Sequence, residues 1–253
     1  MRKISRAILF LTITCMLSAC SFTNTGKGNI SKGEYEDRFT QQEHYIADFS
    51  KGYPQGFYLR NDRGNGLPFN CCFSKDNAEF NNGVMNLHLT TANNERGYAG
   101  AELCSVQTFG YGYYSVMMKP AKCPGVISSF FTYIGWPWHE IDIEFLGHNT
   151  NIVQFNHYTD GVGGHEYFYE LGFDASLDYH EYGFDWNEDS IIYYVDGVAV
   201  YKTTTQIPSV PSKIMMNLWN VHESNTSWAG KFEPSKLPVT SSYKWIGYQT
   251  ENV

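Results

Sequence analysis

Short segments in which hydrophobic and polar residues alternate recur along the chain and predict β-strands. Residues 84–89 alternate along their whole length, and residues 152–158 place Gln154, Asn156 and Tyr158 on one face. This period of two is the period of side chains along a strand. Further strands are expected at residues 113–118, 127–133, 191–195, 198–201 and 213–219.

The segments between these strands carry turn residues, and no long window shows the 3.6-residue period of an amphipathic helix. Asp196-Gly197 separates two predicted strands and is a two-residue hairpin signal. Aromatic residues make up 17% of the 253-residue chain, which favours strands, and 23 glycines serve the turns. We predict one all-β domain, a sandwich of antiparallel sheets that begins near Tyr45.

Residues 140–145 alternate acidic and apolar side chains in the order Glu-Ile-Asp-Ile-Glu-Phe. As a strand, the segment puts Glu140, Asp142 and Glu144 on one face and its apolar side chains on the other. Neighbouring like charges destabilise a fold, so such a row is typical of a functional site. Two carboxylates that flank a glycosidic bond are the usual means of hydrolysing it.

A solvated strand face would show the same alternation and is the competing interpretation. No Lys or Arg lies on the strand to neutralise the acids, and several aromatic residues are close in sequence: Tyr133, Trp136, Trp138 and Tyr158. Aromatic ring faces pack on the C–H faces of sugars. Both features favour a carbohydrate site over a structural strand.

The formal net charge of −8 argues against nucleic acid and acidic polysaccharides as partners, because phosphate binding requires a basic surface. A neutral substrate fits this charge. The chain has neither a G-x-S-x-G nucleophile elbow nor a phosphate-binding loop, so lipase, protease and nucleotide chemistry find no support.

The N-terminus has the pattern of an export signal. Arg2, Lys3 and Arg6 precede the apolar residues 7–16, a stretch too short to span a bilayer. Leu17-Ser18-Ala19-Cys20 then resembles a bacterial lipobox, which predicts lipidation at Cys20. We expect a signal peptide at 1–19, a flexible tether at 20–40 and the domain at 41–253. The expected product is an exported lipoprotein at the cell surface or in the periplasm, with ordinary secretion as the alternative.

Four cysteines remain in the expected domain: Cys71, Cys72, Cys104 and Cys123. In an exported protein they can form disulfides, and three pairings are possible. Adjacent Cys71 and Cys72 point to opposite faces of a strand, so one bridge is expected but its partners stay open. Their spacing does not suggest zinc.

Several segments together resemble glycoside hydrolase family 16, and within it the bacterial lichenases, which are 1,3-1,4-β-D-glucan endohydrolases. The similarity extends from about Asn65 to Tyr248 and is carried by residues 118–122, 128–133, 140–147, 153–156, 161–163, 171–175 and 213–220. The short ExDxE form is shared with lichenases and xyloglucan-active relatives, whereas laminarinase-like members carry one more residue. The resemblance implies a jelly-roll sandwich with a concave substrate cleft.

The resemblance also implies roles for individual residues. Glu140 would be the nucleophile of a retaining hydrolase, Glu144 the general acid and then base, and Asp142 a residue that tunes their ionisation. Sugar hydroxyls would bond to Asn65, Glu102, Gln154, Asn156 and Asn217, and sugar rings would stack on Phe131, Tyr133, Trp138, Tyr158 and Trp219. The chemistry would need no metal or organic cofactor, and a monomer is expected.

The chain departs from the lichenase pattern at several positions. His139 stands where an aspartate is usual, Cys104 where many lichenases have an arginine that contacts substrate, and Gly100 where Cys71 would find its disulfide partner. Lys244 replaces an aspartate that binds a structural calcium. Because a lysine cannot coordinate calcium, we expect that site to be lost, and a calcium-dependent rise in melting temperature would contradict this.

The segment 135–138 also looks shorter than its lichenase counterpart, which would reshape the cleft beside the acidic strand. These departures leave alternatives open. One is an enzyme of the same fold that acts as a β-1,3-glucanase, a xyloglucanase or a transglycosylase. Another is a glycan-binding lipoprotein without activity, although a binding module has no reason to retain Glu140, Asp142 and Glu144 together.

Overall fold

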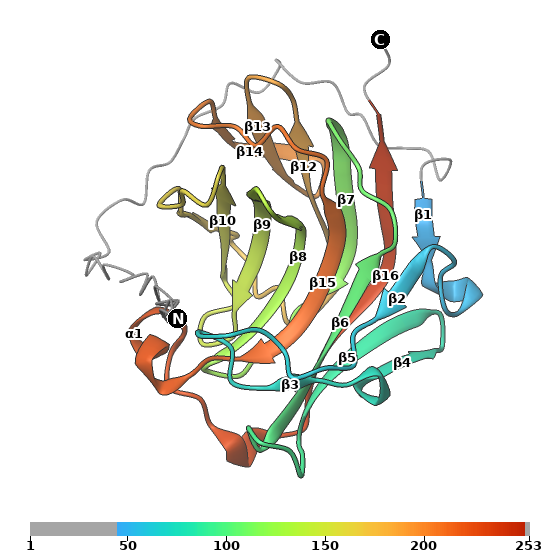
Figure 1. The fold of residues 1–253 in the computed structure, drawn as a ribbon, viewed down its shortest axis with the longest axis vertical. Helices are drawn as coiled ribbons and strands as arrows, with labels where there is room; N and C mark the ends of the chain where they lie inside the picture. Colours follow the sequence, from blue (N-terminus) through green and yellow to red (C-terminus); the bar gives the residue numbers. More distant parts are fainter. Residues whose placement is uncertain (1–44, 251–253) are drawn as a thin grey trace, which may run out of the picture.

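The computed structural model describes residues 45–250, so the expected signal peptide, Cys20 and the tether lie outside the described residues. The described strands follow one another with short connections (Figure 1). They are β1 (Tyr45–Asp48), β2 (Phe57–Leu59), β3 (Cys72–Phe73), β4 (Ala78–Asn81), β5 (Val84–Thr91), β6 (Tyr98–Ser105), β7 (Gly112–Lys119), β8 (Val126–Gly135), β9 (Trp138–Leu146), β10 (Ile152–Tyr158), β11 (Tyr167–Glu170), β12 (His180–Trp186), β13 (Ile191–Val195), β14 (Val198–Thr203), β15 (Lys213–Asn220) and β16 (Val239–Gln249).

Helical structure in the described part consists of short turns. They are η2 (Phe49–Lys51), η3 (Lys75–Asn77), η4 (Glu223–Asn225), α1 (Thr226–Ala229) and η5 (Pro234–Lys236). Between residues 45 and 250, no helix has the length and apolar character needed to cross a membrane. The predicted all-β class is confirmed.

Apart from the short parallel pairing of β3 with β6, the strands form two antiparallel sheets that curve together (Figure 1). The front sheet has the order β11-β10-β9-β8-β15-β6, and the back sheet has the order β5-β16-β7-β12-β13-β14. The two sheets are continuous where β5 pairs with β6, at Thr90 with Ala99 and Thr91 with Tyr98. This arrangement confirms the predicted jelly-roll sandwich.

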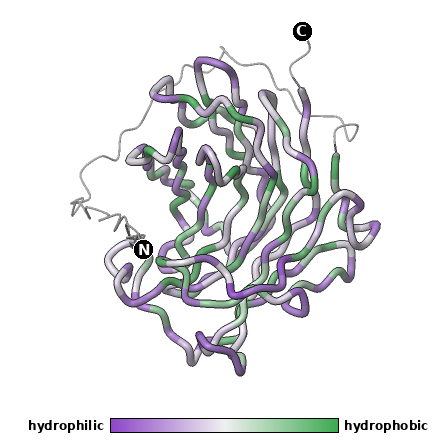
Figure 2. Tube along the Cα trace, in the orientation of Figure 1, coloured by the Kyte–Doolittle hydropathy of each residue, from purple (hydrophilic) through white to green (hydrophobic). Residues whose placement is uncertain are grey.

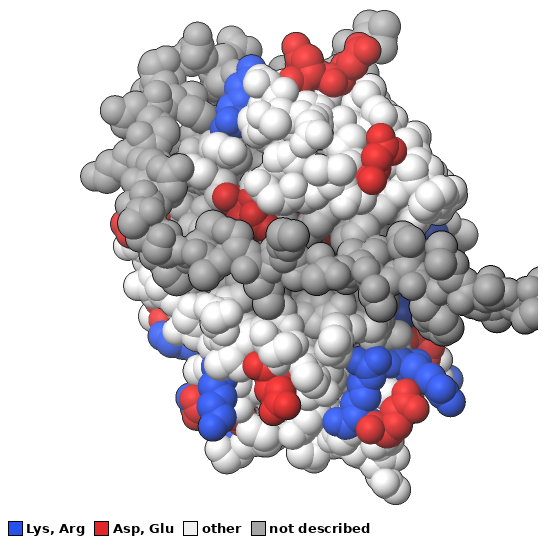
Figure 3. Space-filling view, turned by 60° about the vertical axis from the view of Figure 1, so that its left-hand side comes forward, with Lys and Arg blue, Asp and Glu red and all other residues white. Residues whose placement is uncertain are grey.

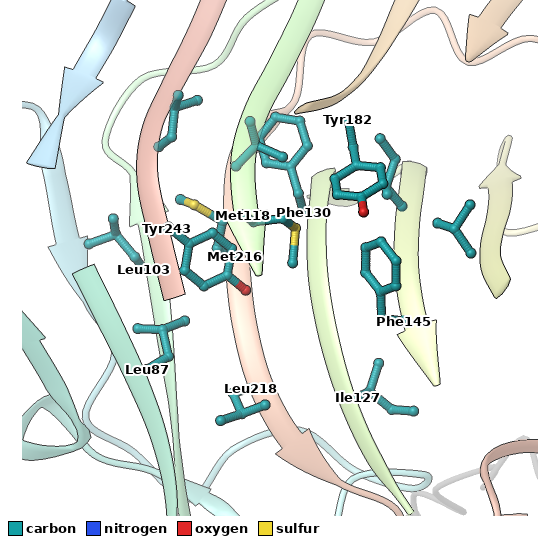
Figure 4. Packing of buried hydrophobic residues seen from close by; sticks show 14 of the residues in the cluster. Leu87, Leu103, Met118, Ile127, Phe130, Phe145, Tyr182, Met216, Leu218 and Tyr243 are labelled. Carbon is teal, nitrogen blue, oxygen red and sulfur yellow. The ribbon is translucent and has the colours of Figure 1, made fainter. Parts of the chain in front are cut away.

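The core lies between the two sheets. Phe145 of β9 packs edge-on against Tyr182 of β12, with ring centroids 4.8 Å apart. Phe130 and Met216 of the front sheet and Met118 of the back sheet fill the same layer and are fully buried (Figure 4). Each such side chain contributes about 2 kcal/mol of hydrophobic stabilisation. This burial fixes which side of β9 faces inward, so its acids must face outward.

The predicted strands correspond to β5, β7, β8, β9, β10, β13, β14 and β15, and the tube in Figure 2 shows hydrophobic and hydrophilic positions following one another along the strands. The hairpin predicted at Asp196-Gly197 joins β13 to β14. Alternation did not identify β6, β12 or β16. In β6, seven of the eight residues are buried, so both faces are covered and polar and apolar residues do not alternate along it.

The expected disulfide is not formed. All four cysteines of the described part, Cys71, Cys72, Cys104 and Cys123, are free thiols. The Cys71 sulfur lies 3.0 Å from the position that a Cβ on Gly100 would occupy, so its neighbour across the strands carries no side chain. Burial raises the pKa of the Cys71 thiol to about 12, which keeps it protonated and unreactive.

Candidate active site

Strand β9 carries the three acids on the outer face of the front sheet, which we call the site face. Glu140 and Glu144 are half-buried, whereas Asp142 between them is only 5% exposed. The neighbouring strands β8 and β10 place one residue on each side of each acid. The cross-strand neighbours are Tyr133 and Tyr158 for Glu140, Phe131 and Asn156 for Asp142, and Ser129 and Gln154 for Glu144. The predicted shared face of the acids is therefore present.

Glu140 is held by two hydrogen-bond donors. The indole Nε1 of Trp138 donates to its Oε2 at 2.7 Å. Asp142 shares a side-chain hydrogen bond with the same carboxyl group. Burial raises the pKa of Glu140 to about 7, and both hydrogen bonds oppose that rise because they stabilise the ionised form. Near neutral pH this carboxylate can therefore act as a charged nucleophile.

Asp142 is the most deeply buried of the three acids. Burial raises its pKa well above the usual range, and the charges of Glu140 and Glu144 raise it further. A protonated Asp142 has an O–H group that can donate to Glu140. A neutral Asp142 that donates to Glu140 is the arrangement that the predicted tuning role requires, and the role itself stays a prediction.

Glu144 has different partners. The Nε2 of Gln154 donates to its Oε2 at 2.8 Å, and Trp228 Nε1 in turn donates to Gln154 Oε1 at 2.8 Å. Burial raises the pKa of Glu144 to about 8, with further contributions from the negative charges of Glu140 and Glu166. Glu144 is thus protonated at neutral pH, as a general acid must be.

Replacing Asp142 tests its role as a neutral donor. We expect Asp142→Asn to keep kcat/KM within about threefold, because an amide N–H can still donate to Glu140. Asp142→Ala removes the donor and should cost about 10- to 100-fold, the range for a hydrogen bond to a charged group. The acidic limb of the pH profile should also move to higher pH in the alanine variant. Equal losses in the two variants would contradict a donor role.

A second polar cluster lies across the site face on β15 and β6. Asn217 Nδ2 donates to Glu102 Oε2 at 2.9 Å, and Ser129 donates a hydrogen bond to Asn217. Arg60 Nη1 donates to Glu102 Oε1 at 2.7 Å and to Asn65 Oδ1 at 3.0 Å. The structure thus brings together three of the predicted hydroxyl-binding residues, Asn65, Glu102 and Asn217, through an arginine that sequence reasoning did not select.

Removing Arg60 should both destabilise the fold and weaken substrate binding. Glu102 is 1% exposed, so Arg60→Met would leave a buried carboxylate without its cation, at a cost of about 3–5 kcal/mol. We expect a lower melting temperature and a KM raised about tenfold, because Asn65 loses its donor and Glu102, which accepts from Asn217, loses its cation. Arg63→Met is the matched control, since that side chain is 86% exposed. Adding Glu102→Gln should restore stability, and equal effects of Arg60→Met and Arg63→Met would contradict this role.

Aromatic residues border the acids. Trp138 is 38% exposed and stacks on Tyr158, with ring centroids 4.6 Å apart and planes 14° apart. Phe131 and half-buried Tyr133 lie on the strand beside Glu140 and Asp142, packed with Cys104 and Met215. The predicted stacking residue Trp219 is 2% exposed, and its ring stacks on Phe69 at 3.8 Å. Trp219 is therefore packed beneath Phe69 and offers no open ring face on which a sugar could stack.

The departures at His139 and Cys104 have distinct surroundings. His139 is 2% exposed, its Nε2 lies 3.3 Å from Asp160, and its Nδ1 accepts a bond from the Ser209 N–H at 3.4 Å. It therefore braces loops behind Trp138. Cys104 is fully buried on the site face, and its thiol donates to Glu102 at 3.7 Å. Burial raises the pKa of this thiol strongly, so it is neutral.

Among residues 45–250 no cluster of three or more His, Cys, Asp or Glu side chains could hold a metal. Lys244 Nζ instead lies 4.3 Å above the Tyr179 ring, and Lys119 Nζ lies 5.1 Å from the same ring. Each is a cation–π contact. The expected loss of the calcium site stays a prediction.

The jelly roll, the paired carboxylates and the amide and aromatic side chains around them together define a glycoside hydrolase. The sequence pattern of Glycosyl hydrolases family 16 matches residues 65–242, and the chain belongs to this family.

Within this family, the chain is similar to proteins named beta-glucanase and to a lichenase structure. The chain is 42% identical over 249 residues to a beta-glucanase of Bacillus amyloliquefaciens, which covers 96% of this chain and 98% of that protein. It is 50% identical over 189 residues to a beta-glucanase of Paenibacillus polymyxa. That alignment covers 73% of this chain and 78% of that protein. A crystal structure of a prokaryotic β-1,3-1,4-glucanase (lichenase) from a mouse hindgut metagenome matches with a TM-score of 0.78 and 44% identity, over 81% of this chain and 98% of that one.

Proposed function

We propose that the protein is a retaining endo-β-glucanase that hydrolyses β-1,4 bonds in mixed-linkage 1,3-1,4-β-D-glucan. The observation that carries the proposal is the contrast between Glu140 and Glu144. Burial raises the pKa of both groups, but hydrogen bonds from Trp138 and Asp142 oppose the rise at Glu140, whereas neighbouring negative charges add to it at Glu144. One charged and one neutral carboxyl group on one face is the requirement of a double-displacement mechanism.

In the first step, a carboxylate oxygen of Glu140 attacks the anomeric carbon of the sugar, and the bond from that carbon to the glycosidic oxygen breaks. Glu144 transfers its proton to the leaving oxygen. The product is a glycosyl ester on Glu140 and a free chain end. Asp142 and Trp138 donate to the carboxylate before attack and hold it in position.

In the second step, water attacks the same carbon from the side that the leaving group vacated. Glu144, now ionised, accepts a proton from this water, and the ester bond to Glu140 breaks. The two inversions restore the original β-configuration and both carboxyl groups. Gln154 keeps the side chain of Glu144 oriented through both transfers.

A neutral glucan is the substrate class that the charges favour. The net charge is −8. On the face of the molecule that Figure 3 shows, most of the described Lys and Arg side chains lie near the lower end, beside Asp and Glu side chains. The similar proteins are named beta-glucanase, and the similar crystal structure is that of a β-1,3-1,4-glucanase. The proposed linkage preference rests on these likenesses.

A substrate panel tests the proposal. Residues 41–253 should cleave barley β-glucan to short mixed-linkage oligosaccharides and leave laminarin and xyloglucan intact. Activity on laminarin or xyloglucan instead would show that the changes at Cys104 and His139 have altered the specificity. Long transfer products would indicate a transglycosylase.

We further propose that the protein is exported and anchored to a membrane surface through lipidated Cys20. The apolar residues 7–16 and the Leu17-Ser18-Ala19-Cys20 pattern support this location. Cell fractionation of the full chain and a Cys20→Ala variant tests the proposal. The unchanged chain should follow the membranes, and its presence in the soluble fraction would contradict the anchor.

A further inference from the structure

One large apolar side chain beside the active site has no role in the mechanism. Trp136 is 93% exposed, more than any other large hydrophobic side chain among residues 45–250. Single exposed apolar residues are common on protein surfaces, but tryptophan is on average among the well-buried types. An indole this exposed is therefore unusual for a tryptophan.

Trp136 occupies the turn between β8 and β9. The pairing of these strands continues up to Gly135 opposite Trp138, so Trp136 and Pro137 alone form the turn. Strand β9 begins at Trp138, which at about 3.4 Å per residue lies roughly 7 Å along the strand from Glu140, and the turn follows directly beyond it. Trp136 stands at the rim of the same hairpin that carries the acids.

The turn end of this hairpin is braced by the loop that follows β10. Gly161 N–H donates to the Trp138 carbonyl at 2.9 Å, and His139 is held by Asp160. Gly135 has no side chain, and the Tyr133 hydroxyl lies 3.2 Å from the position of a Cβ there. The site face of β8 therefore carries no side chain between Tyr133 and the turn. Trp136 projects from a supported hairpin at the edge of this bare stretch.

We propose that Trp136 is an additional sugar-stacking platform, which holds a glucosyl unit of the same neutral β-glucan chain at the rim of the site face, beyond Trp138 and Tyr158. The inference rests on the proposed function and adds a contact outside the acids. The turn residues Gly135, Trp136 and Pro137 are uncharged, so the contact is that of an aromatic face with sugar C–H groups. Trp136 is separated from the exposed Trp138, whose indole bonds to Glu140, by Pro137 alone, and this closeness to the acids points to the substrate as the occupant.

Substitution of Trp136 tests the platform. Trp136→Ala should raise KM on barley β-glucan about five- to tenfold while kcat changes less than about twofold. Trp136→Tyr retains a ring face and should recover most of the affinity. Val198→Ala is the matched control, because Val198 follows another two-residue hairpin turn and is 56% exposed. Equal KM values for Trp136→Ala and Val198→Ala would overturn the proposal.

A binding measurement separates this inference from the proposed function. Affinity electrophoresis in barley β-glucan would compare Glu140→Gln with Glu140→Gln/Trp136→Ala, and the double variant should be retarded less. If the wild-type protein cleaves barley β-glucan but the two variants migrate alike, the platform alone is wrong. If the wild-type protein neither binds nor cleaves any β-glucan, the proposed function fails first. A monomer–dimer equilibrium lost in Trp136→Ala, with unchanged glucan affinity, would assign the indole to a second copy and also overturn the proposal.

Discussion

Glu140→Gln is expected to lower kcat on barley β-glucan by about 10⁴-fold or more while KM stays within a few-fold, because an amide cannot form the glycosyl ester. The shape and hydrogen-bonding capacity of the side chain are nearly retained, so binding should persist. Initial rates of reducing-end release, measured over a concentration series of glucan, separate the two parameters.

Two controls distinguish a chemical defect from misfolding. Glu79→Gln makes the same change on an exposed side chain of β4, which pairs with β5, and should leave the rate unchanged. Folding should not suffer in Glu140→Gln. The pKa of Glu140 is raised from 4.5 to about 7, so the native state binds this proton more tightly than the unfolded state, and the ionised group costs stability increasingly as pH rises through that interval. The glutamine variant should therefore melt at or above the wild-type temperature at pH 8. A variant that retains a tenth of the activity would contradict the nucleophile assignment.

Glu144→Gln is expected to lower kcat/KM on barley β-glucan by about 10³-fold, within the range for removal of a general acid. The loss should depend on the leaving group. The acidic phenol of an aryl β-glucoside leaves as its anion and needs no proton. For such a substrate, kcat/KM should therefore fall less than about tenfold. The second step then lacks its base, and the glycosyl ester on Glu140 should accumulate and be detectable by mass spectrometry of the intact protein.

The pH profile gives an independent test of this assignment. Glu140, with a pKa of about 7, must be ionised, so activity falls on the acidic side. Glu144, with a pKa of about 8, must be protonated, so activity falls on the alkaline side. These limbs belong to the pair of interacting groups. Glu144→Gln should remove the alkaline limb for the aryl substrate, and a profile that keeps both limbs would contradict the general-acid role.

Local pattern was sufficient to predict the acidic row. Strand alternation alone puts Glu140, Asp142 and Glu144 on one face, and the burial of Phe145 against Tyr182 turns that face outward. The different roles of Glu140 and Glu144 depend on residues that lie close in space. Trp138 is two residues from Glu140, but Trp228, which orients the glutamine beside Glu144, comes from α1 far along the chain.

Long-range contacts also explain what sequence reasoning missed. Arg60 reaches Glu102 across 42 positions of sequence, and no local pattern identifies such a pair. Trp219 shares a face with Asn217, as alternation predicts, yet Phe69 from a distant loop covers its ring. The sequence could not assign the expected disulfide, although it already placed Gly100 at the position of the partner of Cys71, and the Cys71 sulfur does lie beside Gly100.

The anomeric configuration of the first product tests the central claim most directly. Proton NMR spectra, recorded within the first minutes of barley β-glucan hydrolysis, would follow the new reducing end before it mutarotates. We predict that the β-anomer appears first and that the α-anomer grows in later, as two inversions at Glu140 require. The α-anomer appearing first would show a single displacement and would contradict the roles assigned to Glu140 and Glu144.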